Sequence, residues 1–210
     1  MKRFIFIPIV TNFHLLQKAI DSVPKDLYDD YFVFNNSGGP LSIDLKQFKV
    51  LEFGGRKTFL ETQNIMRQYA IDNAYDYYSF MHNDGEIQDD TCNRLVELAD
   101  SQTGKWSVIF TNYDVLCAFS TECLEHIGPW GDDLWPKDQQ TGYYLDNDYY
   151  MRMKLQWADS IQLPNSNVLH NEFSNTIRDA TEKKRWSSQM ARVQMHYIMK
   201  WGGLPGHEAP

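Results

Sequence analysis

The stretch FIFIPIV at residues 4–10, which is followed by Thr11 and Asn12, decides the fold. A continuous apolar run of this length is typical of a strand that is buried on both faces, as in a parallel sheet. Residues 13–21 then carry apolar side chains at helical spacing, so we expect a helix directly after the strand. The chain therefore begins with the strand-then-helix order of an α/β protein.

The same order repeats along the first half of the chain. Strands are predicted at Tyr31–Phe34, Phe48–Phe53 and Tyr77–Met81, and helices at about Phe59–Ala74 and at Thr91–Asp100. Strands that alternate with helices indicate a mostly parallel sheet with helices on both faces. The polar residues that follow the strands should then gather at the carboxyl edge of this sheet, where such proteins bind ligands.

The second half of the chain is less regular. Its pattern predicts strands near 106–113, 115–120, 160–163 and 168–169, helices at 121–126, 148–157 and 179–201, a turn at 128–131 and a polar loop at 132–142. We expect Asp148 to cap the helix that starts there. Residues 1–203 thus read as a single domain, and residues 204–210 as a tail or a linker to further domains of a longer chain.

Composition and charge narrow the function classes. The chain has 210 residues, a net charge of -8 and no basic run longer than Lys183-Lys184-Arg185, which argues against a nucleic-acid partner. No apolar stretch is long enough to span a membrane. The three cysteines form no CxxC pair, which favours a reducing compartment, and we therefore predict a cytoplasmic protein.

Carboxylates in two places have the setting of a reactive site. His82-Asn83-Asp84 follows an apolar strand, and a carboxylate at a strand end can hold a divalent cation. The alternative is a simple turn, because Asn-Asp-Gly is strong turn chemistry. Asp146 stands near the start of a helix, where it can face a cleft and act as a general base.

Two further positions offer ligand or anion contacts. His170 ends an apolar run, and its imidazole would favour manganese over magnesium as a bound metal. A lone histidine is alternatively a structural residue. Arg56 follows a glycine pair at a strand end and can approach a diphosphate. Walker A, GxGxxG, HExxH and GxSxG motifs are missing from the sequence, so ordinary nucleotide, zincin and serine-hydrolase sites receive no support.

These segments, in this order, resemble the GT-A fold glycosyltransferases, and especially the inverting family 2 type. The resemblance implies a Rossmann-like α/β domain with a mixed, mostly parallel sheet flanked by helices. Residues 6–12 are similar to the strand and loop that hold the nucleotide, which implies donor contacts from the residues at its end: Pro8, Ile9, Val10 and Thr11. Asn36 lies in a turn that resembles the family's base- or ribose-reading turn, with Asn in place of Asp.

The same resemblance assigns roles around the metal. Asn64 resembles a donor-side residue of the helix that leads into the DxD strand, and His82-Asn83-Asp84 occupies the DxD place without its first Asp. Asp84 would bind the metal and diphosphate, His82 would lie near the ribose, and Asn83 would touch the donor. His170 resembles the late histidine that completes some metal sites.

The catalytic and acceptor side follows the same pattern. The segment 144–152 resembles the family's acidic segment, with Leu145 in place of its Glu, and this alignment makes Asp146 the catalytic base. Trp130, Trp135 and Tyr143 are candidates for the acceptor wall. The one-domain form is also similar to the amino-terminal transferase domain of chlorella-virus capsid-glycosylating proteins, which would place the chain in the host cytoplasm.

The resulting prediction is a transferase that moves a sugar, with inversion, from a nucleotide-diphosphate donor, UDP-linked in the first instance, to a hydroxyl of a glycan or glycoprotein. Its cofactor would be Mn2+ or Mg2+. Two alternatives stay open from the sequence. One is a nucleotidyltransferase or another nucleotide-sugar enzyme, and the other is a non-catalytic carbohydrate-binding module.

Overall fold

The computed structural model describes residues 1–132, 135, 142–171 and 179–209. Along the chain the elements are β1 (Arg3–Ile9), α1 (Phe13–Ser22), β2 (Asp30–Asn35), β3 (Lys49–Leu51), α2 (Phe59–Asp72), β4 (Tyr77–Met81), β5 (Gly85–Ile87), α3 (Thr91–Asp100), β6 (Val108–Thr111), β7 (Tyr113–Ser120), α4 (Thr121–Ile127), α5 (Leu145–Gln156), β8 (Ile161–Gln162), β9 (Val168–His170) and α6 (Ala180–Trp201). The polar loop that the sequence predicts at 132–142 lies largely outside the described residues.

Seven strands form the central sheet, in the order β3-β2-β1-β4-β7-β6-β8. Neighbouring strands are parallel except that β7 runs antiparallel to both of its neighbours, β4 and β6. The prediction of a mixed, mostly parallel sheet flanked by helices is confirmed. A second, two-stranded sheet pairs β5 with β9 in antiparallel register.

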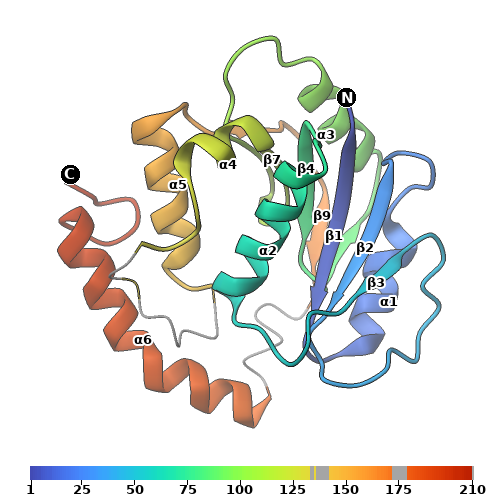
Figure 1. The fold of residues 1–210 in the computed structure, drawn as a ribbon, viewed down its shortest axis with the longest axis horizontal. Helices are drawn as coiled ribbons and strands as arrows, with labels where there is room; N and C mark the ends of the chain where they lie inside the picture. The colour runs from blue at the N-terminus through green and yellow to red at the C-terminus, as the bar shows by residue number, and fades with distance from the viewer. Residues whose placement is uncertain (133–134, 136–141, 172–178, 210) are drawn as a thin grey trace.

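Alternation along β1 builds two cores, one on each face of the sheet. Ile5, Ile7 and Ile9 point to the face covered by α1 and α3, whereas Phe4 and Phe6 point to the face covered by α2, α4 and α5. Because successive side chains of a strand point to opposite faces, one uninterrupted apolar run serves both layers. Figure 1 shows α2 and α1 on opposite sides of the strands β1 and β2.

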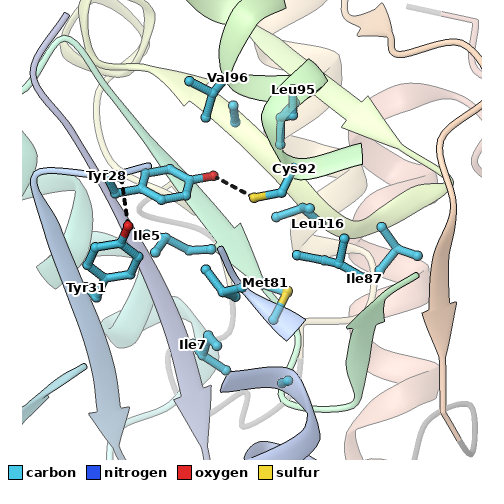
Figure 2. Packing of buried hydrophobic residues seen from close by; sticks show 14 of the residues in the cluster. Ile5, Ile7, Tyr28, Tyr31, Met81, Ile87, Cys92, Leu95, Val96 and Leu116 are labelled. Atoms are coloured by element: carbon cyan, nitrogen blue, oxygen red, sulfur yellow. Dashed lines mark hydrogen bonds between the residues drawn. The ribbon is translucent and has the colours of Figure 1, made fainter. Parts of the chain in front are cut away.

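The layer under α1 and α3 contains a small polar group within its apolar packing. The Tyr28 hydroxyl donates to Ser79 Oγ at 2.9 Å and lies 3.4 Å from Cys92 Sγ. Figure 2 shows this tyrosine reaching across the cluster toward Cys92, with Leu95 and Val96 above it. A buried hydroxyl with these partners is satisfied, so we assign Tyr28 a structural role.

The three cysteines are free and buried. Cys92 belongs to the α1–α3 face, and Cys117 and Cys123 belong to the opposite face. Burial raises the pKa of the Cys92 and Cys123 thiols to about 12. Within the part of the chain that the structure describes, no helix is both long enough and apolar enough to cross a membrane.

Helix starts follow local chemistry where that chemistry is strong. Thr58 and Glu61 form a capping box at α2: Thr58 Oγ1 accepts from the Glu61 N–H, and Glu61 Oε2 accepts from the Thr58 N–H. Asp179 caps α6 by accepting from two backbone N–H groups. The α6 helix therefore runs over 180–201, close to the range that the sequence predicts.

The predicted start of α5 is wrong. The helix begins at Leu145, with Tyr144 as its N-cap in a left-handed conformation (φ 64°). Asp148 therefore lies inside the helix and is not its cap. Its side chain is fully buried, and Oδ1 accepts from Trp201 Nε1 at 2.9 Å and lies 2.6 Å from Lys200 Nζ. The carboxylate that looks like a cap fastens α6 to α5 instead.

The last part of the chain packs along this α5–α6 contact. Figure 1 shows α6 on one flank of the molecule, beside α5. Beyond it, the Ala209 N–H donates to the Trp201 carbonyl at 2.9 Å, and the Tyr197 hydroxyl donates to Glu208 Oε1 at 2.5 Å. Residues 204–209, which the sequence predicts as a tail or linker, therefore contact the domain through α6.

Candidate functional site

The carboxyl ends of β1 and β4 meet at one edge of the sheet. The two strands are parallel neighbours, so the residues that follow them emerge side by side. Asn83 Nδ2 donates to the Thr11 carbonyl at 3.2 Å and ties the two loops together. Thr11 and His82-Asn83-Asp84, which the sequence predicts at the ligand-binding edge, are thus brought to one place.

Asp84 lies between two histidines at this edge. Its Oδ1 is 3.3 Å from His170 Nε2 and 3.8 Å from His82 Nδ1. One ligand atom from each of the three residues lies within 4.8 Å of the others. A carboxylate and two imidazoles at such distances are a donor set that can hold a divalent transition-metal ion, with further positions left for a ligand.

The β5–β9 pair brings His170 to Asp84 although the two residues are far apart in sequence. Gly85 is opposite His170 in this pair, and the Asn171 N–H donates to the Asp84 carbonyl at 2.8 Å. Gly85 has no room for a side chain, since a Cβ there would stand 2.9 Å from Val115 Cγ1. The β5–β9 pair thus fixes both the backbone and the side chain of Asp84, which is 4% exposed.

His82 belongs to the candidate metal group, and its ring is 5.4 Å from the His170 ring. Its place near the ribose stays a prediction from the family resemblance. The turn alternative for this segment is also realised, because the Gly85 N–H donates to the His82 carbonyl at 3.0 Å. The turn and the metal group therefore coexist: the turn aims the side chains that could bind the ion.

A polar atom next to this group has no partner among the described residues. The hydroxyl of Thr11 is buried there without a hydrogen bond. The adjacent Asn12 has a left-handed backbone (φ 65°) and begins α1. Buried hydroxyls are nearly always bonded, so the Thr11 hydroxyl is an exception, and in this conformation its oxygen is closed off from solvent.

A second acidic group lies at the start of α5. Burial and the neighbouring Asp114 carboxylate raise the pKa of Asp146 to about 7. The Tyr150 hydroxyl is 3.5 Å from Asp114 Oδ2, and burial, with contributions from both carboxylates, raises the pKa of Tyr150. A carboxyl that titrates near neutral pH is suited to accept a proton in a reaction.

Three predicted donor-binding residues have internal partners in the structure. Both amide atoms of Asn36 bond to the backbone of Lys57, at 2.6 Å each. Asn64 bonds both backbone groups of Trp130. Arg56 makes a two-pronged ion pair with Glu182, at 2.7 and 2.6 Å. In this conformation these side chains hold loops together, and their contacts with a donor stay predictions.

The remaining predicted contacts divide by burial. Ile9 is fully buried in the core, whereas Pro8 and Val10 are partly exposed at the strand end. Trp130 and Trp135 are each 1% exposed, so the predicted acceptor wall is wrong for both. Trp130 stacks on Tyr149 with ring centroids 4.1 Å apart. Tyr143 is partly exposed, and its ring lies 5.7 Å from that of Trp186.

Sequence reasoning missed Asp114, which shares the site with Asp146. Asp114 belongs to the first residues of β7 and reads as an ordinary polar residue between two predicted strands. The available signal is the break in the apolar pattern at Asn112-Tyr113-Asp114, which marks a turn. That turn lies at the same edge of the sheet, because the Val115 carbonyl accepts from the His82 N–H at 2.8 Å.

No family model matches this sequence, and no curated protein matches it significantly. Solved structures do share its fold. The mannosyltransferase PcManGT from Pyrobaculum calidifontis, in complex with GDP-Man and Mn2+, has a TM-score of 0.57 and 14% identity over 91% of this chain and 64% of that one. S. aureus TarS 1-349 has a TM-score of 0.61 and 11% identity over 94% of this chain and 66% of that one.

A third such structure is glucosyl-3-phosphoglycerate synthase from Mycobacterium tuberculosis, in complex with Mn2+, UDP and glucosyl-3-phosphoglycerate. It has a TM-score of 0.56 and 13% identity over 91% of this chain and 80% of that one. The chain thus spans about two thirds of the length of the first two proteins. At these identities the likeness concerns architecture, and it shows that the chain has the GT-A type of mixed α/β fold.

Proposed function

We propose that the protein is a metal-dependent glycosyltransferase that moves a sugar from a nucleotide-diphosphate donor to a hydroxyl of a glycan or glycoprotein. The observation that carries this proposal is the grouping of His82, Asp84 and His170 at the carboxyl edge of a GT-A type sheet. Ligands of open α/β sheets bind at this edge. The three solved structures support the proposal as members of one fold, two of them with Mn2+ and a nucleotide or nucleotide sugar.

The donor set fits Mn2+, with Mg2+ as the alternative. Asp84 supplies a hard oxygen ligand, and His170 and His82 supply imidazole nitrogens, which favour manganese over magnesium. A metal bound there would neutralise the negative charge of the diphosphate leaving group. Our proposal therefore assigns Asp84 and His170 to the metal, as the sequence suggested, and adds His82 to them.

The donor would lie over the β1 side of the metal group. Pro8, Val10 and Thr11 are partly exposed there. Asn83 holds the Thr11 carbonyl and so keeps this loop against the metal group. A UDP-sugar is the first candidate donor, and GDP-Man in PcManGT makes a GDP-sugar the second.

Asp146 would be the base that receives the proton of the acceptor hydroxyl. Its pKa of about 7 leaves a large ionised fraction at neutral pH while keeping the carboxylate basic. The deprotonated hydroxyl would attack the anomeric carbon from the face opposite the diphosphate, which gives inversion. Positioning of the two substrates and stabilisation of the leaving charge would supply most of the rate.

The proposed location is the cytoplasm, which the three free and buried cysteines support. The similarity to chlorella-virus capsid-glycosylating domains, and with it a host cytoplasm, stays a prediction from the sequence.

A thermal-shift screen of nucleotide sugars with Mn2+ and with EDTA tests the proposal. We expect one nucleotide sugar to raise the melting temperature only when Mn2+ is present, because a ligand that binds the native state stabilises it. His170→Ala should abolish this Mn2+-dependent shift. His126→Ala is the matched control, since His126 is exposed and its ring packs at a tilt against Trp157.

Turnover then separates the reaction classes. Release of the nucleoside diphosphate, with an acceptor or by slow hydrolysis, supports a glycosyltransferase. Release of pyrophosphate from a nucleoside triphosphate and a sugar phosphate would show a nucleotidyltransferase instead. Sugar binding without any response to nucleotide sugars would leave a carbohydrate-binding module and overturn the proposal.

A further inference from the structure

Tyr113 is an unusual residue at the site edge. Its side chain is 80% exposed, whereas most tyrosines of this protein are buried or partly buried. Its backbone is left-handed, with φ of 60°. That conformation is uncommon for residues other than glycine and is an outlier for a bulky side chain. Neither local preference nor burial therefore explains an aromatic ring at this position.

The turn that carries Tyr113 is held firmly from both sides. Asn112 Oδ1 accepts from the Val168 N–H at 2.9 Å, and Asn112 Nδ2 donates to the Val168 carbonyl. Thr111 Oγ1 donates to the Leu116 carbonyl at 2.6 Å. The turn that carries the ring is thus bonded to its neighbours and held at a fixed place.

That place is beside the candidate metal group. Val115, two residues after Tyr113, accepts a hydrogen bond from the His82 N–H. Val168, which Asn112 holds, stands two residues before His170 in β9. The Tyr113 turn is therefore bonded to the two segments that carry the histidines. Leu169, 47% exposed, follows Val168 and adds another exposed apolar side chain near the turn.

Asp114 links the same turn to the proposed base. It directly follows Tyr113, and its carboxylate acts on Asp146 and lies near the Tyr150 hydroxyl. Tyr113 is thus one residue away from a group that interacts with Asp146.

The order of strands in the sheet separates the Tyr113 ring from the proposed donor side. His82 and Asp84 follow the end of β4, which has β1 and β2 on one side and β7 and β6 on the other. The Thr11 loop lies on the β1 side, where the proposed donor binds. Tyr113 lies on the β7 side, which remains for the second substrate.

We propose that Tyr113 is the acceptor platform: its ring stacks on the apolar face of a sugar ring whose hydroxyl is directed toward Asp146. The acceptor class is thereby a saccharide or glycoside. This inference rests on the proposed function. A tyrosine ring offers a large contact surface with few rotatable bonds, so little freedom is lost on binding. The fixed turn further reduces that loss.

Binding of simple glycosides tests the platform directly. We would measure saturation-transfer NMR and affinities for methyl glycosides of glucose, galactose, mannose and N-acetylglucosamine, with UDP and Mg2+ present. We expect the wild type and Tyr113→Phe to bind at least one glycoside, and Tyr113→Asn to weaken that binding about 10-fold. Asn tolerates the left-handed backbone, so this variant should fold at least as well as the wild type.

Met199→Asn is the matched control, because Met199 on α6 is also 80% exposed and should leave glycoside affinity unchanged. Equal binding by wild type and Tyr113→Asn would overturn the proposal, as would a wild type that binds none of the glycosides. UDP affinity is measured on the same samples. If UDP fails to bind with Mg2+ or Mn2+ to the wild type, the proposed function fails, and this outcome is separate from any change at Tyr113.

Discussion

Two acidic groups at the same sheet edge differ in their neighbours. Asp84 is 4% exposed and lies between His82 and His170, whereas Asp146 faces another carboxylate, Asp114. Imidazole nitrogens complete a cation site around the first carboxylate. Burial, together with the like charge of Asp114, raises the pKa of the second carboxyl, so that it holds its proton to higher pH. The comparison teaches that the neighbouring side chains, and not burial alone, decide whether a carboxyl group at this edge of the sheet is suited to bind a metal ion or a proton.

The largest effect should come from removing the carboxylate of the first group. Asp84→Ala leaves two histidines without their shared anion, so we expect Mn2+ affinity and sugar transfer to fall by about 100-fold or more. Isothermal titration with Mn2+ and a nucleoside-diphosphate release assay measure the two losses. Glu125→Gln, an exposed residue of α4, is the control. Unchanged Mn2+ affinity in Asp84→Ala would show that Asp84 is not a metal ligand, and the proposed difference between Asp84 and Asp146 would then be wrong.

The next effect concerns the proton-accepting group. Asp146→Asn cannot take up a proton, so we expect transfer to fall by roughly 10²–10⁴-fold while Mn2+-dependent donor binding stays near the wild-type level. Single-turnover transfer and a donor titration measure the two properties separately. A variant that retained near-normal transfer would show that Asp146 is not the base.

Stability separates this loss from unfolding. The raised pKa of Asp146 means that the native state keeps its proton up to a pH of about 7, against an ordinary value of 3.8. The native state is therefore favoured at low pH, and this contribution is lost as the pH rises from about 4 through 7. Urea unfolding should show that Asp146→Asn is more stable than the wild type at pH 8, with little such gain at pH 4.

The smallest effect should come from the partner carboxylate. Asp114→Asn removes the like charge, so the pKa of Asp146 should fall and the acidic limb of the kcat/KM profile should move to lower pH. Burial still raises the pKa, so the shift should be only part of the way to an ordinary aspartate. Tyr150→Phe tests the hydroxyl beside Asp114 separately. An unmoved profile in Asp114→Asn would mean that the two carboxyls act independently.

The fold was predictable because its signals are local. The apolar run 4–10 is enough by itself to predict a buried strand. The strand predicted at Tyr77–Met81 has the same bounds as β4. The start of α5 was not predictable, since Tyr144 begins it in a left-handed conformation that its residue type does not favour. Asp148 reads as a cap because its actual partners, Lys200 and Trp201, are brought to it only by folding.

The site was predictable to the extent that it consists of strand ends. Thr11 and Asp84 follow buried strands, and parallel pairing brings them together. Arg56 also follows a strand, yet folding gives it Glu182 as a partner from the far end of the chain. Asp114 gives no signal of its own. Its effect depends on Asp146, which a single sequence does not place beside it.

Because buried thiols lie on both faces of the sheet, the opening rate of each packed layer can be measured separately. Cys92 lies under α1 and α3, whereas Cys117 and Cys123 lie on the other face of the sheet. Thiols react as thiolates, and burial raises the pKa of all three, so alkylation must wait until the layer above a given thiol opens. Alkylation rates at Cys92 and at Cys123 therefore report separately how often the layer on each face of the sheet opens, and no cysteine has to be introduced by mutation.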